Sequence, residues 1–385
     1  MRNMKIAMFG HKRVPSREGG IEIVVEELTG RMVAQGHQVT CYNRRGHHVS
    51  GTEFDTKRQS DFHGVKLKSV WTLDRKGLAA MTASISAAFL SAFSKADVVH
   101  IHAEGPAFMC WLPRLLGKRV VVTVHGLDWQ REKWKNGFGS KYIHAGEKMA
   151  VKLAHEIIVL SKNTQDYFME TYGRETVFIP NGVNKPEICP AEKIAETYGL
   201  HKDDYFLFLG RLVPEKGVHY LVEAFLNTKT DKKLVIAGGA SGTDGYIKGL
   251  KELAKDDDRI IFTGFVQGQM LEELYSNAYV YVLPSDVEGM PLSLLEAMSY
   301  GNCCLTSTIP ECTEVVGDKA VSFQKSDVAA LTETLQKLAD EPALVASYKA
   351  TARDFICEKY DWNTVTNKTM ELYHENSVDQ QVPVS

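Results

Sequence analysis

Paired cysteines are missing from this sequence. Its seven cysteines form no Cys-x-x-Cys pair, which argues against a disulfide framework and against a cysteine-rich zinc site. The first apolar segment is too short for a signal peptide, and the GxGxxG fingerprint of dinucleotide-binding oxidoreductases is incomplete throughout. These absences predict a protein of the reducing cytoplasm and argue against a dinucleotide oxidoreductase.

A strong overall charge is missing too. The formal net charge of −3 excludes a uniformly basic protein, and we expect no nucleic-acid partner. Residues 1–180 nevertheless carry 26 Lys and Arg against 17 Asp and Glu, whereas the rest of the chain carries 19 against 31. A basic first half suits an anionic acceptor, a lipid headgroup or an anionic surface. A solvated charge imbalance explains the count equally well.

Long apolar runs are rare. The one long uncharged stretch, residues 77–94, is rich in Ala and Ser rather than Leu and Ile. Although its length is close to that of a membrane helix, we expect a helix packed against a sheet. The predicted location is the cytoplasm, and contact with the inner face of the cell membrane is left open.

Short apolar runs are abundant, at intervals too wide for hairpins and with helical patterns between them, which predicts parallel sheets covered on both faces. The runs lie at residues 5–10, 38–43, 65–70, 97–102, 119–124, 156–161 and 177–180, and again at 205–210, 233–238, 259–264, 279–284, 302–307 and 320–323. A chain of 385 residues exceeds one ordinary core. The fold class is therefore α/β, built twice.

A linker signal separates the two halves. The stretch IPNGVNKPEICP combines Asn-Gly with three prolines. We place a first domain at residues 1–183 and a second at 184–360. Residues 361–377 are predicted to form a helix that packs back on the first domain, and 378–385 a polar tail.

Two loops that follow strands carry residues suited to binding an anion, since ligands of open parallel sheets bind beyond the carboxyl ends of the strands. Gly19 and Gly20 let the backbone approach a ligand, and the helix after them offers free N–H groups. Arg211 and Lys216 can neutralise a diphosphate leaving group. Taken alone, each loop is also compatible with a flexible turn or with solvated surface charges.

Two glutamates interrupt the apolar segment SDVEGMPLSLLEAMSYG. Glu296 falls four residues after Leu292 and so on the same helical stripe. A carboxylate buried there must be paired or hydrogen-bonded. Glu288 lies in the preceding loop, and both acids therefore require a partner or a ligand.

The ordered segments GGIE, VTVHG, IPNGV, GRLVPEKG, FTGFV and EGMPLSLLEAMSYG resemble the retaining glycosyltransferases of family 4. The resemblance covers essentially the whole chain, and the spacing of Glu288 and Glu296 is its most specific part. It implies the GT-B architecture, two facing Rossmann-like domains with an interdomain cleft. It also implies transfer from a nucleotide diphosphate-sugar, by family frequency a UDP-sugar, to a carbohydrate or lipid-linked acceptor without a metal or a further cofactor. The GGIE loop is similar to that of bacterial enzymes of surface polysaccharide synthesis.

The resemblance also implies roles for residues of the second domain. Glu296 would accept hydrogen bonds from ribose hydroxyls, and Glu288 would face hydroxyls of the donor sugar. Arg211 and Lys216 would hold the diphosphate. The base would meet the backbone of residues Gly264, Phe265 and Val266.

For the first domain, the resemblance implies that Gly19 and Gly20 approach the phosphates and that His125 lies near the sugar ring. The family lacks an established protein nucleophile, and attack on the same face as the departing diphosphate is the usual proposal. We therefore assign His125 to positioning or charge stabilisation, and neither glutamate to nucleophilic attack. His100 and His102 alternate on one strand but have no third metal ligand at a convincing spacing.

The acceptor site is assigned to Asp128, Trp129 and Arg131, in a segment where aromatic and basic residues alternate. An ordinary mobile surface loop is the competing interpretation. Two alternatives to a transferase stay open: a GT-B sugar-nucleotide epimerase or phosphorylase, and a nucleotide-sugar-binding regulator without turnover.

Overall fold

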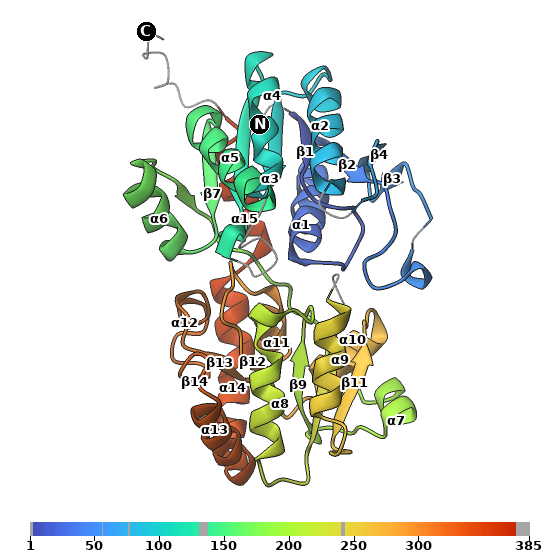
Figure 1. Ribbon diagram of the computed structural model, residues 1–385. Coiled ribbons are helices and arrows are strands. Elements are labelled where there is room, and N and C mark those ends of the chain that lie inside the picture. The colour runs from blue at the N-terminus through green and yellow to red at the C-terminus, as the bar shows by residue number, and fades with distance from the viewer. Residues whose placement is uncertain (1–2, 56, 76–77, 131–137, 240–242, 375–385) are drawn as a thin grey trace.

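Two parallel sheets organise the chain, one in each half, and stack as two lobes in the computed structural model (Figure 1). The structure describes residues 3–55, 57–75, 78–130, 138–239 and 243–374. Within them the first sheet has eight strands in the order β3-β4-β2-β1-β5-β6-β7-β8. These are β1 Lys5–Phe9, β2 Gln38–Arg44, β3 Asp61–Phe62, β4 Val65–Val70, β5 Val98–His102, β6 Arg119–Val124, β7 Glu156–Val159 and β8 Val177–Phe178.

The second sheet has six strands in the described residues, in the order β11-β10-β9-β12-β13-β14. They are β9 Tyr205–Leu209, β10 Lys233–Ala237, β11 Ile260–Gly264, β12 Val280–Leu283, β13 Cys303–Ser307 and β14 Val321–Phe323. The registers are parallel, except that β3 pairs with β4 in antiparallel register, which the spacing of apolar runs did not predict. The two-sheet α/β fold class predicted from the sequence is confirmed.

Helices cover the sheets. They are α1 Gly20–Ala34, α2 Ala79–Ala92, α3 Glu104–Ala107, α4 Trp111–Leu115, α5 Phe138–Leu153, α6 Lys162–Tyr172, α7 Lys193–Tyr198, α8 Val218–Leu226, α9 Asp244–Leu253, α10 Gln269–Asn277, α11 Leu292–Ser299, α12 Pro310–Val316, α13 Val328–Asp340, α14 Pro342–Lys359 and α15 Trp362–Glu371. Short 3₁₀ turns lie at η1 Thr52–Phe54, η2 Phe108–Cys110, η3 Asp128–Gln130 and η5 Pro214–Lys216.

Strand burial explains why the runs were recognisable. Each residue of β5, β6 and β12 is buried, because helices cover both faces of a parallel sheet, so these strands are almost continuously apolar. Helix α1 instead buries one stripe, which includes Val25, Leu28 and Met32.

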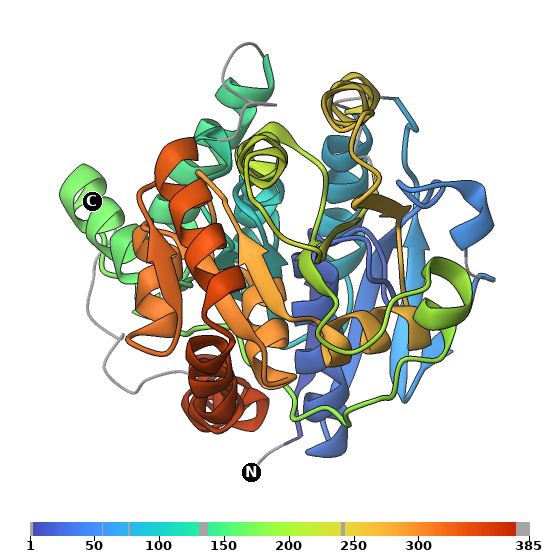
Figure 2. The same cartoon turned by 90° about the horizontal axis from the view of Figure 1, so that it is seen from below.

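The chain crosses between the lobes twice at one place. Val183 leaves the first lobe beside Asp361, where the chain returns, and the Val183 N–H donates to the Tyr360 carbonyl at 2.8 Å. Helix α15 then packs on α1 of the first lobe; in Figure 1 it is the red helix within the upper lobe. The Tyr373 hydroxyl lies 2.6 Å from Nδ1 of His100. Seen from below, the C-terminal lobe lies in front of the N-terminal lobe (Figure 2). The predicted tail, 378–385, lies outside the described residues.

The uncharged stretch forms helix α2. Its small residues Ala83, Ala87 and Ala88 are buried in the core of the first lobe, whereas Ile85, Phe89 and Phe93 are exposed. In the described part of the chain, no helix has both the length and the apolar character needed to cross a membrane.

Candidate functional site

The loops after β9 and β12 of the C-terminal lobe hold an ion pair. Lys216 Nζ lies 2.5 Å from Oε1 of Glu288, and the Ser285 hydroxyl donates to the same oxygen at 2.6 Å. Both charged side chains are largely buried, at 14% and 8% exposed. The Asp286 N–H donates to the Glu215 carbonyl at 2.9 Å, so the backbones of the two loops are joined. A rigid pair of charges therefore lies at the carboxyl ends of neighbouring strands.

Glu296, on the second turn of α11, has a partner on each oxygen. Arg17 of the N-terminal lobe donates from Nη2 to Oε1 at 2.9 Å, and the Tyr275 hydroxyl donates to Oε2 at 3.2 Å. Burial of Arg17 lowers its pKa, but the charges of Glu296, Tyr275 and Glu26, with the hydrogen bond to Glu296, together outweigh this effect and raise the pKa overall. The carboxylate that the sequence left without a partner is thus neutralised from the opposite lobe.

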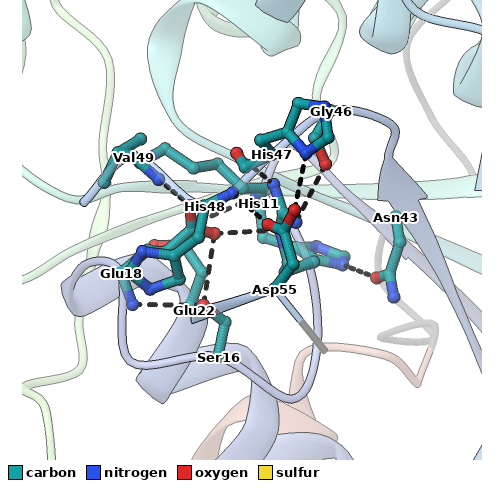
Figure 3. Close-up of polar contacts among 12 residues, drawn as sticks. His11, Ser16, Glu18, Glu22, Asn43, Gly46, His47, His48, Val49 and Asp55 are labelled. Carbon is teal, nitrogen blue, oxygen red and sulfur yellow. Dashed lines mark hydrogen bonds and ion pairs between the residues drawn. The ribbon is translucent and has the colours of Figure 1, made fainter. Parts of the chain in front are cut away.

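The loop that carries Arg17 is held by a second acid, Glu18 (Figure 3). Its carboxylate, whose side chain is 0% exposed, lies 2.9 Å from Nε of Arg13. It also accepts from the Val49 N–H at 2.9 Å and from the Ser16 hydroxyl at 3.2 Å. These contacts fix the residues on both sides of Arg17 to the strand β2 side of the lobe.

Lys12 of the N-terminal lobe is buried near charges of both signs. Burial lowers the pKa of Lys12; Glu22 and Glu18 oppose this effect, while Arg211 of the other lobe lowers the pKa further. The Lys12 backbone N–H donates to Glu22 at 2.8 Å, and that glutamate lies in the first turn of α1, directly after Gly19 and Gly20.

His125 lies where the lobes touch. A Cβ atom at Gly289 would lie 1.7 Å from the His125 carbonyl oxygen, so the loop that carries Glu288 runs directly against the end of β6. Nε2 of His125 lies 3.0 Å from Nδ1 of His102. Burial, with the charges of His100 and His125, holds the pKa of His102 well below its usual value, and the neutral ring of His102 orients His125.

The segment predicted to meet the base contacts the N-terminal lobe. The Phe265 ring lies 4.8 Å from the rings of both His48 and Phe54, edge to face. Ser50 of the same N-terminal loop lies against Gly239. Gly264 is exposed and Val266 is partly buried. Gly20 of α1 faces Leu292 of α11, so the proposed phosphate and ribose regions are adjacent.

The predicted acceptor residue Asp128 contacts Glu104, which forms a buried pair of acids with Glu147. The Asp128 N–H donates to Oε2 of Glu104 at 2.9 Å. Burial, followed by the charge of Asp128 and contact with Glu147, raises the pKa of Glu104 well above its usual value. Trp129 packs beside His144 and Tyr167, and its buried indole Nε1 has no hydrogen-bond partner among the described residues. Arg131 lies outside the described residues.

Several residues of the site were not predicted from the sequence. Arg17 and Tyr275 contact Glu296, Glu104 holds the Asp128 backbone, and the Asn181 side chain donates to the Met290 carbonyl at 3.3 Å. The cation two residues before Gly19-Gly20 and the asparagine of IPNG were visible signals. Tyr275 and Glu104 gave none, because their roles depend on contacts between distant segments.

Two family models match the chain, one in each half. Residues 18–185 match the model described as Glycosyltransferase Family 4, and residues 191–355 match Glycosyl transferases group 1. Glycogen synthase of Mycobacterium tuberculosis is 28% identical, over 96% of this chain and 94% of that protein.

Solved structures are similar as well. Sucrose-phosphate synthase from Thermosynechococcus elongatus superposes with a TM-score of 0.80 at 19% identity, covering 96% of this chain and 98% of the other. Anabaena HepE in complex with UDP and glucose gives a TM-score of 0.78 at 16% identity, covering 96% and 99%. At these identities the likeness concerns the fold.

Proposed function

Because this chain belongs to the GT-B glycosyltransferases of the family 4 type, which act on nucleotide sugars, we propose that it transfers a sugar from a UDP-sugar with retention of configuration and without a metal ion. The acceptor is a carbohydrate or a lipid-linked carbohydrate, and the product belongs to a surface polysaccharide or glycoconjugate. UDP and glucose bound to HepE support the donor class. The names of glycogen synthase and sucrose-phosphate synthase support a carbohydrate acceptor.

The main support for this proposal is the contact between the two lobes at Gly289. The contact between Gly289 and the His125 carbonyl brings the N-terminal lobe against the loop of Glu288, which is paired with Lys216. A donor sugar held at Glu288 would therefore have its diphosphate beside Lys216 and Arg211 and its ring beside His125. A site closed by both lobes excludes water, which competes with the acceptor for the sugar.

In the reaction the bond between the sugar anomeric carbon and the diphosphate oxygen breaks, and a bond from the acceptor hydroxyl oxygen forms on the same face. The hydroxyl proton passes to the departing diphosphate oxygen. Lys216 and Arg211 stabilise the negative charge that develops on that oxygen. His125 is held by His102 at 3.0 Å and contributes positioning.

The epimerase and regulator alternatives are not favoured. An epimerase needs an acid and a base at the sugar carbon, but Glu288 is engaged by Lys216 and Ser285. A regulator that only binds the nucleotide sugar breaks no bond, so it has no need of a cation such as Lys216 to stabilise a leaving group.

The test is release of UDP from a panel of UDP-sugars with simple glycoside acceptors, with NMR of the anomeric configuration and a parallel reaction in EDTA. We expect an α-linked donor to give an α-linked product in both reactions. Glu296→Gln is expected to weaken UDP binding at least 10-fold. Inversion, loss of activity in EDTA, or unchanged UDP affinity would each contradict the corresponding part of the proposal.

We further propose that the N-terminal lobe contacts the anionic inner face of the cell membrane through the α2 face, defined as Trp71, Ile85, Phe89, Leu90 and Phe93. All five side chains are exposed, and α2 and α4 lie together on the upper lobe (Figure 1).

Cations border the α2 face. Lys118 donates to the carbonyl of Ser94, next to Phe93, at 2.8 Å, and Lys68 lies over the ring of Tyr42, whose hydroxyl donates to the Leu90 carbonyl. Apolar side chains with two lysines beside them suit an anionic lipid surface, and a lipid-linked acceptor would be presented there.

A further inference from the structure

Arg17 connects the two lobes at the group that the proposed function assigns to ribose. It belongs to the loop before α1, yet it donates to a carboxylate 279 residues further along the chain. Tyr275 takes the second oxygen of that carboxylate. Both oxygens of Glu296 therefore have a partner, and a pair of ribose hydroxyls that binds this carboxylate competes with them.

Of the two partners, Arg17 is the one able to leave. The Tyr275 ring is buried, stacks on Tyr300 at 5.2 Å and belongs to the same lobe as Glu296. The Arg17 side chain is 39% exposed and reaches Glu296 from the other lobe. An exposed ion pair of this kind is worth little by itself, so ribose hydroxyls can replace it.

The backbone of Arg17 stays in place when the side chain moves. Ser16 and Glu18 on either side are fixed to each other, to Arg13 and to Val49 (Figure 3). Gly19 and the first turn of α1 follow within two residues. A released guanidinium consequently remains at the amino end of a 15-residue helix, whose free N–H groups favour an anion, and Gly20 of that helix faces Leu292 in the first turn of α11.

We propose that Arg17 exchanges partners during the reaction cycle: it holds Glu296 in the donor-free enzyme and binds the donor diphosphate once ribose has taken Glu296. Bidentate hydrogen bonding makes a guanidinium well suited to both carboxylate and phosphate. The exchange rests on the proposed function. It adds an N-terminal cation to the leaving-group site and makes contact between the lobes depend on the donor.

The experiment compares a nucleoside with its diphosphate, uridine and UDP, in wild type and in Arg17→Ala. Removing Arg17 takes away the competitor for Glu296 but also a ligand of the diphosphate. Uridine should therefore bind equally well or more tightly, whereas UDP should bind at least 10-fold more weakly. Affinities come from calorimetry for UDP and from ligand-observed NMR for uridine, and uridine signals that appear only with the variant count as tighter binding.

Arg45→Ala, an exposed arginine on the same lobe, is the matched control and should change neither affinity. Arg17→Lys should recover part of the UDP affinity, and thermal unfolding should be unchanged in Arg17→Ala. The proposal is wrong if UDP affinity is unchanged, or if uridine and UDP weaken by the same factor, as a merely structural residue would cause. If wild type binds none of UDP, GDP and ADP, the proposed function itself fails; if it binds GDP or ADP instead, the same comparison is made with that nucleotide and its nucleoside.

Discussion

The backbone of Gly289 lies so close to His125 that a Cβ atom would be 1.7 Å from the His125 carbonyl oxygen. Real Cβ contacts are never this short, and the two residues belong to different lobes. A larger side chain at position 289 would therefore push the lobes apart. Only glycine, whose side chain is a hydrogen atom, allows the lobes to approach this closely.

Gly289→Ala is expected to lower kcat/KM at least 10-fold, because a shift of about 1 Å at a reacting centre is enough to cost about 100-fold. Steady-state kinetics measures this loss, and small-angle scattering should show a larger radius of gyration. Gly249→Ala is the control. Position 249 lies in α9 with nothing within 4 Å of an added Cβ, so activity should be retained and stability should rise by about 1 kcal/mol. Equal activity of both variants would refute the close contact.

Lys216→Met is expected to reduce kcat by about 100-fold or more, in the range found when one group that stabilises a developing oxyanion is removed. It also leaves Glu288 buried without a counter-charge, so thermal stability should fall. Adding Glu288→Gln should restore stability but not kcat, since the leaving group still lacks its cation. Recovery of kcat in the double variant would show that Lys216 serves only to neutralise Glu288. Lys248→Met, on the exposed face of α9, is the matched control.

The buried acid Glu104 predicts a pH dependence of stability. Its pKa is raised by burial, then by the charge of Asp128 in the loop after β6 and by Glu147 on α5, which itself accepts from the hydroxyls of Tyr167 and Tyr172. The folded protein therefore keeps a proton that the unfolded chain releases. Stability from this group is complete below the usual glutamate pKa, about 4.3, and is lost as pH rises toward the folded pKa.

Glu104→Gln tests this sign. A glutamine amide can accept from the Asp128 N–H and donate its own N–H to Glu147 without taking up a proton from solution. The variant should therefore gain stability relative to wild type as pH rises, by up to about 1.4 kcal/mol per pH unit. Thermal unfolding between pH 5 and 8 measures the difference. A gap that stays constant or reverses would mean that Glu104 is ionised in the folded protein.

Tyr373→Phe is expected to loosen α15. Burial, with the charge of His125, lowers the pKa of His100 to about 3, so its ring is neutral. One ring nitrogen donates and the other accepts, toward Tyr373 at 2.6 Å and Thr123 at 2.7 Å. Leaving one nitrogen unpaired costs about 1–3 kcal/mol, which should appear as faster hydrogen exchange in residues 362–373. Tyr198→Phe, at a partly exposed position, should change nothing; equal exchange in both variants would contradict the prediction.

Phe89→Ser combined with Phe93→Ser is expected to reduce binding to phosphatidylglycerol-containing vesicles about 10-fold or more, because both rings leave the α2 face. Added salt should weaken the binding that remains through screening of the lysines. Co-sedimentation measures both effects. Met169→Ser removes an exposed apolar side chain on α6 and serves as control. Unchanged binding of the double variant would exclude the α2 face as the membrane contact.

The fold could be predicted because strand burial leaves a local trace. The run RVVVTV, fully buried in β6, and the stripe through Val25 and Leu28 in α1 are periodic within a few residues. The two-residue, antiparallel β3 left no such trace, since Asp61 is exposed and Phe62 is only partly buried. The charged residues Arg211, Lys216 and Glu288 could be placed at strand ends for the same reason, as loops follow directly from the strand pattern.

The sequence by itself determined the two α/β sheets, their connection and the requirement that Glu296 have a partner, because each depends on residues that are neighbours along the chain or along one helix. Only the tertiary structure decided which partner that is. Arg17 lies 279 residues away, and no periodicity encodes a contact between lobes, so the pairing depends on how the two sheets are stacked and on where α15 returns the chain.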